Sequence, residues 1–190
     1  MSRDIEHGEI VNRVARIQAR IRDAVRESIL KQSTEELSSV AAETSGDTIY
    51  SIDRVSEDLL VSLFAECFSD TSIVLIGEGL DDGGVTFPAS VDPKEARYRV
   101  IVDPIDGTRG LMYDKRSAWV LTGVADNRGP ETNLTDIVVA VQTEIPVTKQ
   151  YRSDVLWAIQ GGGAFAVGHD VLSGEDIPIT LQPSRSTTIE

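Results

Sequence analysis

The sequence predicts an α+β fold in which two long N-terminal helices pack on a mostly antiparallel β-sheet. Two observations support this prediction. Through the first third of the chain, apolar residues recur every three or four positions, as on one face of a helix. Beyond it, apolar residues gather in short β-branched runs that are separated by turn residues. Helices followed by strands are typical of a layer of helices that covers one sheet.

The first helix is predicted from about Glu9 to Gln32. Its apolar face consists of Ile10, Val14, Ile17, Ile21, Val25 and Ile29. Five arginines occupy the more polar arc, namely Arg13, Arg16, Arg20, Arg22 and Arg26. We interpret this arc as a solvated face, with a phosphate- or partner-binding face as the alternative. The following stretch, Lys31 to Thr48, is rich in Ser, Thr, Glu and Ala and predicts a turn or loop.

The second helix is predicted from about Asp53 to Phe68. Val55, Leu59, Leu63 and Cys67 follow one another at steps of four. Asp53 would stand at the helix start, where exposed amides and the helix dipole favour a carboxylate. Capping alone is a sufficient explanation for that residue.

The remainder of the chain predicts a series of short strands. Turns at Asp81–Gly84, Asn127–Pro130 and Gly161–Gly163 separate some of them. The predicted strands are Ile73–Ile76, Tyr98–Val102, Ala118–Ala125, Ile137–Thr143, Val155–Gln160, Ala164–Val167 and Ile177–Leu181.

Composition excludes several classes of protein. The 190 residues carry a formal net charge of −13, which disfavours binding to nucleic acid. No apolar run approaches the roughly 18 residues that span a bilayer, and the polar N-terminus resembles no signal peptide, so we expect no membrane partner and a cytoplasmic location. The one cysteine excludes an internal disulfide and a cysteine-rich zinc site. An acidic protein that handles phosphorylated substrates would need bound cations to neutralise them locally.

The segment that carries most chemistry runs from Val100 to Thr108. A β-branched strand leads into Asp103, and Pro104 is expected to end strand pairing and set a turn. Asp106 adds a second carboxylate, and Gly107 allows the backbone to bend beside it. Two clustered carboxylates repel each other, and a hard cation such as Mg²⁺ relieves that repulsion. The alternative is that these residues are common turn formers.

A second strand ends in the same way and favours the metal site. Ile73–Ile76 leads into Gly77-Glu78-Gly79, which places Glu78 at the mouth of a turn. If the two strands are neighbours, Glu78, Asp103 and Asp106 converge at one edge of the sheet.

These residues resemble the inositol monophosphatase family, within the lithium-sensitive phosphatase superfamily that includes fructose bisphosphatases. Asp103 to Thr108 is a full copy of the family signature DPIDGT, and Gly77-Glu78 stands where the family has Gly-Glu-Glu. Asp53 matches a further acidic residue, and Gly161–Phe165 matches a later glycine-rich segment. The resemblance implies the first domain of the sugar phosphatase (αβαβα) fold.

The resemblance also implies a set of metal ligands for Mg²⁺. Glu78 and Asp103 would hold a first ion together with the backbone carbonyl of Ile105. Asp103 and Asp106 would share a second ion. Asp53 would bind a third ion or its water shell.

The catalytic residues implied by the resemblance are Thr108, Asp53 and Glu78. Thr108 would orient and deprotonate the attacking water, and the amides of Gly107 and Thr108 would bind the phosphate. The substrate would be a small phosphorylated polyol or sugar. A homodimer and inhibition by Li⁺ are family tendencies.

The chain departs from the family pattern in two places. Gly79 replaces the second Glu of Gly-Glu-Glu. A later Trp-Asp-x-Ala-Ala-Gly motif is missing, because Trp119 and Trp157 precede Val120 and Ala158. We therefore predict a metal-binding phosphatase domain over residues 1–170, with 171–190 as a tail or the start of a second domain whose remainder is absent.

Three hypotheses follow from the sequence. The first is a Mg²⁺-dependent phosphomonoesterase. The second is a truncated, catalytically weak or silent module that binds metal or phosphate. The third is a structural domain in which the acidic residues serve only as turns and caps.

Overall fold

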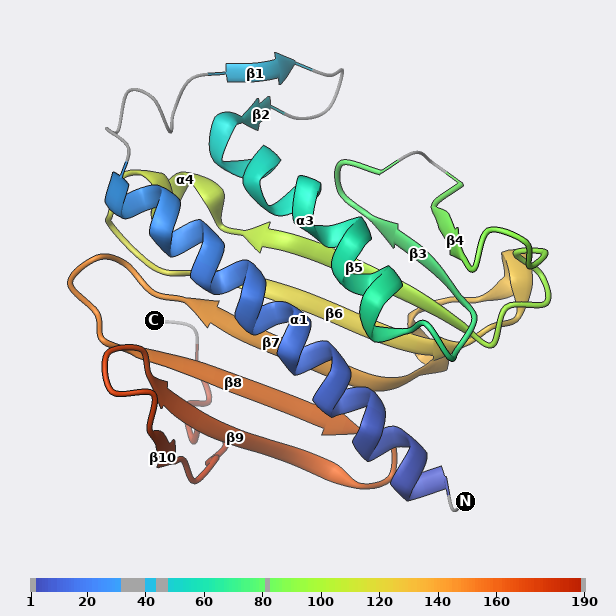
Figure 1. Ribbon diagram of the computed structural model, residues 1–190. Helices are drawn as coiled ribbons and strands as arrows, with labels where there is room; N and C mark the ends of the chain where they lie inside the picture. The colour runs from blue at the N-terminus through green and yellow to red at the C-terminus, as the bar shows by residue number, and fades with distance from the viewer. Residues whose placement is uncertain (1–2, 32–39, 44–47, 81–82, 189–190) are drawn as a thin grey trace.

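A computed structural model describes residues 3–31, 40–43, 48–80 and 83–188; for 3–4, 40–43 and 48–58 it describes the secondary structure only (Figure 1). The helices are α1 (Arg3–Lys31), α3 (Ser51–Cys67) and α4 (Thr108–Met112), with short 3-10 turns at Gly129–Glu131 and Leu134–Asp136. The strands are β1 (Val40–Glu43), β2 (Thr48–Tyr50), β3 (Ile73–Gly77), β4 (Val85–Phe87), β5 (Tyr98–Asp106), β6 (Ala118–Asp126), β7 (Ile137–Ile145), β8 (Arg152–Ile159), β9 (Gly163–Asp170) and β10 (Asp176–Pro178).

Eight of these strands form one mixed sheet in the order β10-β9-β8-β7-β6-β5-β3-β4. Within it, β3 and β5 run parallel, whereas the other neighbouring pairs are antiparallel. β1 and β2 pair separately with each other. The predicted α+β fold with a mostly antiparallel sheet is therefore confirmed.

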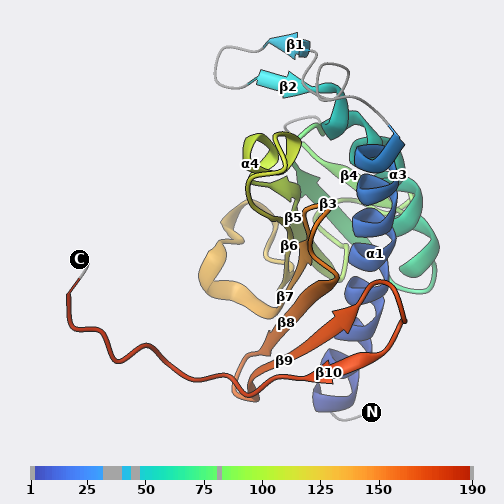
Figure 2. The same ribbon diagram turned by 90° about the vertical axis from the view of Figure 1, so that its left-hand side faces the viewer.

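The two long helices lie on the same face of the sheet. Figure 2 views the sheet nearly edge-on and shows α1 and α3 together on one side, with α4 toward the other. α1 contacts β6, β7 and β8, while α3 contacts β5 and packs beside α1. Within the described residues, neither long helix covers the opposite face of the central strands, and the residues discussed below lie on that face.

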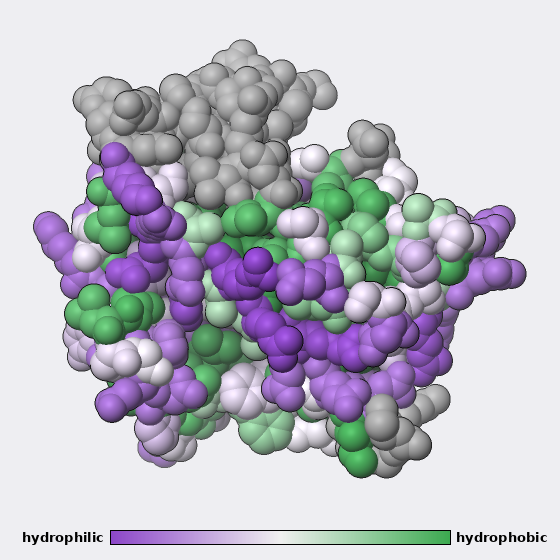
Figure 3. All heavy atoms as spheres, in the orientation of Figure 1, coloured by the Kyte–Doolittle hydropathy of each residue, from purple (hydrophilic) through white to green (hydrophobic). Residues whose placement is uncertain are grey.

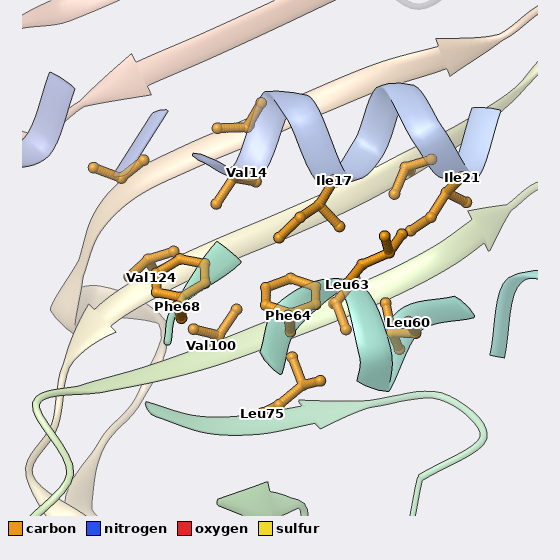
Figure 4. Packing of buried hydrophobic residues seen from close by; sticks show 14 of the residues in the cluster. Val14, Ile17, Ile21, Leu60, Leu63, Phe64, Phe68, Leu75, Val100 and Val124 are labelled. Atoms are coloured by element: carbon orange, nitrogen blue, oxygen red, sulfur yellow. The ribbon is translucent and has the colours of Figure 1, made fainter. Parts of the chain in front are cut away.

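The hydrophobic core lies between the helices and the sheet (Figure 4). Its residues come from both helices and from the strands beneath them, among them Val14, Ile17, Ile21, Leu60, Phe64, Leu75, Val100 and Val124. Each is essentially inaccessible to solvent, and burying a side chain of this kind stabilises the fold by about 1.5–3 kcal/mol. The outer side of α1 is hydrophilic (Figure 3), as the amphipathic pattern predicts.

Most of the arginine arc of α1 is at least partly exposed to solvent, and two of its arginines form salt bridges with α3 and with the residues that follow it. Arg20 forms a 2.9 Å salt bridge with Glu66 of α3, and Arg13 pairs with Asp70 just beyond it. The Arg13 guanidinium and the Thr71 hydroxyl hold the pKa of Asp70 well below its usual range. The interpretation of the arc as solvated is wrong at Arg22, which is 4% exposed.

The structure corrects two other local expectations and adds a strand to a third segment. α1 begins at Arg3, before the predicted start at Glu9, because the polar first turns continue the helix beyond its apolar stripe. The stretch predicted as a turn or loop contains β1. β5 continues through Pro104 to Asp106, because a bulge absorbs the missing amide instead of ending the pairing.

A buried polar cluster connects α1 with the sheet. Gln18 donates from Nε2 to the Thr122 hydroxyl and to the Val141 carbonyl, both at 2.9 Å. The Thr143 hydroxyl donates to Gln18 Oε1 at 2.8 Å. Gln18 and Thr143 are fully buried, so these bonds fix the position of α1 along β6 and β7.

Replacing Gln18 by leucine is expected to lower the free energy of unfolding by about 3 kcal/mol, because buried hydroxyl and carbonyl groups lose their partners. Urea denaturation of the variant would measure the loss. Adding Thr122→Val and Thr143→Val should recover much of it, since no side-chain polar group of the cluster then remains. An equally unstable triple variant would show that packing, and not hydrogen bonding, determines the cost.

Candidate functional site

The parallel pairing of β3 and β5 brings two acidic residues together. Gly77 pairs with Val102, so the next residues along the two strands are Glu78 and Asp103. Val102 faces the core, which directs the adjacent Asp103 to the opposite face. The same alternation places Glu78 on that face beside it, because Leu75 points into the core.

A bulge in β5 brings Asp106 to the same face. Asp103 pairs with Leu121 and Asp106 with Trp119, so three steps along β5 oppose two steps along β6. In a regular strand, residues three apart point to opposite faces. The extra residue in the bulge cancels this difference. Asp103 and Asp106 therefore share the face that α1 and α3 leave open.

Hydrogen bonds fix the backbone between these two carboxylates. The amide of Ile105 donates to Asp103 Oδ1 at 3.1 Å, and Pro104 has no amide to compete for that oxygen. The Thr108 hydroxyl donates to the Ile105 carbonyl oxygen at 2.9 Å. Thr108 thus returns its side chain to the bulge, and the Ile105 carbonyl has a second lone pair for another partner.

Two glycines make this geometry possible. Gly107 precedes α4 with φ at 98°, a left-handed conformation that side chains rarely adopt. At Gly77, a Cβ atom would lie 2.7 Å from both Cγ1 and the carbonyl oxygen of Val102. β3 therefore approaches β5 this closely only because position 77 has no side chain.

A mostly apolar groove of about 690 Å³ extends from the carboxylates over the open face. Glu78 and Asp103 lie among its lining residues, together with Ile101, Leu121 and Leu156. Glu78 and Asp106 are exposed, whereas Asp103 is half-buried. The carboxylates are thus accessible at the border between a polar edge and an apolar surface.

The structure brings together most, but not all, of the residues selected from the sequence. Glu78, Asp103 and Asp106 share an edge and a face, with the Ile105 carbonyl and Thr108 next to them. Asp53 lies in the first turn of α3, but its side chain is outside the described residues. Their roles as ligands and catalysts stay predictions.

The donor set fits a hard divalent cation. Carboxylate, carbonyl and hydroxyl oxygens are the ligands that Mg²⁺ prefers, and Glu78, Asp103, Ile105 and Asp106 supply them from two adjacent strand ends. Within the described residues, no three His, Cys, Asp or Glu side chains already stand in a metal-binding arrangement.

Sequence reasoning missed the contact that anchors the segment after α4. Asp114 has φ at 51°, and its carboxylate accepts hydrogen bonds from the Thr148 amide at 2.8 Å and the Thr148 hydroxyl at 2.6 Å. These bonds lower the pKa of Asp114. The two residues are 34 positions apart, so no local pattern signals the contact.

Comparison with known proteins places the chain by sequence and by fold. The profile of the inositol monophosphatase family matches residues 9–189. No curated protein matches the chain by sequence.

Among solved structures, holo fructose-1,6-bisphosphatase of Leishmania major is similar, with a TM-score of 0.64, 18% identity and coverage of 89% of this chain and 52% of that one. The extragenic suppressor protein suhB of Bartonella henselae has a TM-score of 0.59, 17% identity and coverage of 83% and 51%. A putative sedoheptulose-1,7-bisphosphatase of Toxoplasma gondii has a TM-score of 0.55, 15% identity and coverage of 85% and 52%.

The likeness to these structures concerns the fold. The chain spans about half the length of each of these three proteins. In the described part of the chain, no helix has the length and apolar character that a membrane crossing requires.

Proposed function

The chain belongs to the inositol monophosphatase family, and we propose that it acts as a Mg²⁺-dependent phosphomonoesterase on a small phosphorylated polyol or sugar. The observation that carries the proposal is the placement of Glu78, Asp103 and Asp106 on one open face, produced by the β3–β5 register and the β5 bulge. If these three residues served only to form turns, they would not need to share a face or to lie at adjacent strand ends.

Mg²⁺ would be held by oxygen ligands at this edge. Glu78, Asp103 and the Ile105 carbonyl form one set of ligands, and Asp103 with Asp106 forms the second. Asp53 would add a further carboxylate from α3. When bound, the cation neutralises charge on the phosphoryl oxygens and makes water a better nucleophile.

The protein groups around the ligands would orient the reactants. The Thr108 hydroxyl donates to the Ile105 carbonyl, and its oxygen would accept a hydrogen bond from the attacking water. Thr108 would orient that water, and the single proton that the water loses would pass to one carboxylate of the site, either Glu78 or Asp53. The amides of Gly107 and Thr108 would donate to the phosphate. Transfer to water requires no cysteine nucleophile, which agrees with a single cysteine in α3.

The substrate class follows from the family and from the similar folds. Two of the similar structures are named as enzymes of sugar bisphosphates, fructose-1,6-bisphosphatase and sedoheptulose-1,7-bisphosphatase. A small polyol or sugar ester is therefore the class to test. A cytoplasmic location, a homodimer and sensitivity to Li⁺ belong to the same proposal.

A second candidate is a metal- or phosphate-binding module with weak or no turnover. The chain spans about half the length of each similar structure, so turnover by a protein of their full length is a proposal separate from binding at these ligands. The two candidates share the ligands and differ in catalysis.

Phosphate release from a panel of inositol and sugar phosphates, with Mg²⁺ and with a chelator, tests the proposal. Release that requires Mg²⁺ is the expected result. Thermal stabilisation by Mg²⁺ without release would support the binding module instead. If Mg²⁺ gave no thermal stabilisation and no phosphate were released, the carboxylates would be turn residues only, and both candidates would be overturned.

A further inference from the structure

Two hydrogen bonds join the segment after α4 to the turn between β7 and β8. The Asp114 carboxylate accepts them from the Thr148 amide at 2.8 Å and from the Thr148 hydroxyl at 2.6 Å. We name this pair of bonds the latch. Neither of its residues is a proposed ligand or catalyst. The latch therefore connects the end of α4 to a turn that contributes no group to the site.

The latch lies at the edge of the sheet where the carboxylates lie. Asp106 at the end of β5 pairs with Trp119, and Trp119 pairs with Glu144 near the end of β7. α4 precedes β6 and the turn follows β7, so both segments leave the sheet at the edge where Asp106 lies. A bond between the two segments therefore helps to fix where α4 stands relative to Asp106.

The turn between β7 and β8 is itself held firmly. Gln150 Nε2 donates to Glu144 Oε1 at 2.9 Å, and the Gln150 amide donates to the Val147 carbonyl at 3.0 Å. The other oxygen of Glu144 accepts the Asp154 amide at 3.2 Å. Glu144 is 8% exposed, and a buried carboxylate with both oxygens bonded keeps its partners in place. Thr148 thus donates to Asp114 from a fixed turn.

Backbone bonds carry the position of Asp114 to the start of α4. The Asp114 amide donates to the Leu111 carbonyl at 2.8 Å, and the Leu111 amide donates to the Gly107 carbonyl at 3.3 Å. A continuous series of hydrogen bonds therefore runs from Thr148 to Gly107, the residue before Thr108.

α4 is too short to be stable by itself. It spans Thr108–Met112, and no side chain caps its start at Gly107. Helices of this length depend on tertiary contacts, because the first turn is unfavourable to form. The buried side chains of Leu111 and Met112 hold α4 against the core, and the latch holds the residues that follow it.

The latch also maintains an uncommon backbone conformation. Asp114 has φ at 51°, in the left-handed region that side chains other than Asn and Asp rarely enter. The bonds from the Thr148 hydroxyl and amide, with Lys149 nearby, lower the pKa of Asp114. The carboxylate is thus an ionised acceptor at neutral pH, and hydrogen bonds to an ionised group are stronger than neutral ones.

We propose that the latch positions α4, so that the Thr108 hydroxyl meets the attacking water and the amides of Gly107 and Thr108 meet the phosphate. Thr148 and Asp114 are then positioning residues, which act through α4 and contact no reactant. This inference rests on the proposed phosphatase function and adds two residues to it.

Thr148→Val tests the latch, because it removes the hydroxyl bond and keeps nearly the same shape. For the ester that the wild type hydrolyses fastest, we expect kcat to fall by about tenfold, since a small displacement of a positioned group is costly. The Mg²⁺ concentration for half-maximal activity should stay the same, because the carboxylate ligands Glu78, Asp103 and Asp106 follow from β3 and β5. Thr148→Ser keeps a hydroxyl and should retain the kcat of the wild type.

Thr135→Val is the matched control. The Thr135 hydroxyl likewise donates to one side chain, at 2.7 Å from Asn133 Oδ1, and it is exposed. Thr135 lies in the turn before β7, at the opposite end of that strand from Thr148. Its variant should therefore retain the kcat of the wild type.

Asp114→Gly separates the latch from the strain of the backbone. Glycine adopts the left-handed conformation freely, but it accepts neither bond from Thr148. If only the strain mattered, kcat would stay the same or rise, whereas the latch predicts a loss at least as large as in Thr148→Val. Combining the two substitutions should cost no more than Asp114→Gly alone, because the Thr148 hydroxyl acts through Asp114.

A loss of kcat in Thr148→Val no larger than in Thr135→Val, or an equal loss in Thr148→Ser, would overturn the positioning role while leaving the phosphatase function intact. A parallel rise in the Mg²⁺ requirement would overturn it too, since the whole site would then have loosened. If the wild type releases no phosphate, the phosphatase function fails. Calorimetric binding of inorganic phosphate with Mg²⁺ then decides the latch by itself: weaker binding to Thr148→Val than to Thr135→Val supports it, and equal or absent binding overturns it.

Discussion

Asp103→Asn is expected to reduce Mg²⁺-dependent phosphate release by at least about a hundredfold, because the charge stabilisation that a bound cation supplies is worth several kcal/mol. Asp103 is the residue that both proposed ligand sets share, and it stands between Glu78 and Asp106. Asparagine has nearly the same shape and keeps an oxygen that accepts the Ile105 amide bond. The fold should therefore survive while the site loses a negative charge.

Phosphate release and thermal unfolding, each with and without Mg²⁺, would measure both effects. The wild type should unfold at a higher temperature with Mg²⁺, since a ligand that binds only the native state stabilises it, and the variant should lose most of this gain. The matched control is Asp126→Asn, at the far end of β6, where the same chemical change meets no carboxylate of the site. Full activity of Asp103→Asn would contradict the proposed ligand role.

Gly77→Ala is expected to lower both the stability and the activity of the protein. The added Cβ would lie 2.7 Å from the Val102 carbonyl oxygen, a backbone atom that cannot move without displacing β5. Overpacking of this kind costs about 1–3 kcal/mol. Because Glu78 follows directly, any separation of β3 from β5 also moves that carboxylate away from Asp103, and the affinity for Mg²⁺ should fall.

Thermal unfolding and the Mg²⁺ concentration for half-maximal activity would test this expectation. In a domain of this size, each kcal/mol lowers the midpoint by about 2–4 °C. Gly83→Ala is the matched control, because a Cβ there meets nothing within 4 Å. A Gly77→Ala protein with the stability and Mg²⁺ dependence of the control would show that the two strands can separate at no cost to the site.

Local patterns in the sequence were sufficient to predict the two long helices and the central strands, but not β1, β4 or α4, and they supplied the candidate site residues. The steps of three and four residues from Ile10 to Ile29 predicted α1, and the β-branched runs predicted the central strands, because these signals arise from neighbours along the chain. The residues of the Asp103–Thr108 signature could be recognised in the same way. The prediction that the strand ends at Pro104 was wrong. A proline normally ends strand pairing, and the sequence does not show that a bulge accommodates it.

Only the tertiary structure decided how these pieces meet. The sequence left open whether β3 lies beside β5, which determines whether Glu78 is near Asp103. It also gave no sign that the bulge turns Asp106 to the same face, or that Thr148 bonds to Asp114. The physical reason is that strand pairing and register depend on contacts between residues far apart in the chain, whereas periodicity and turn chemistry are properties of neighbouring residues.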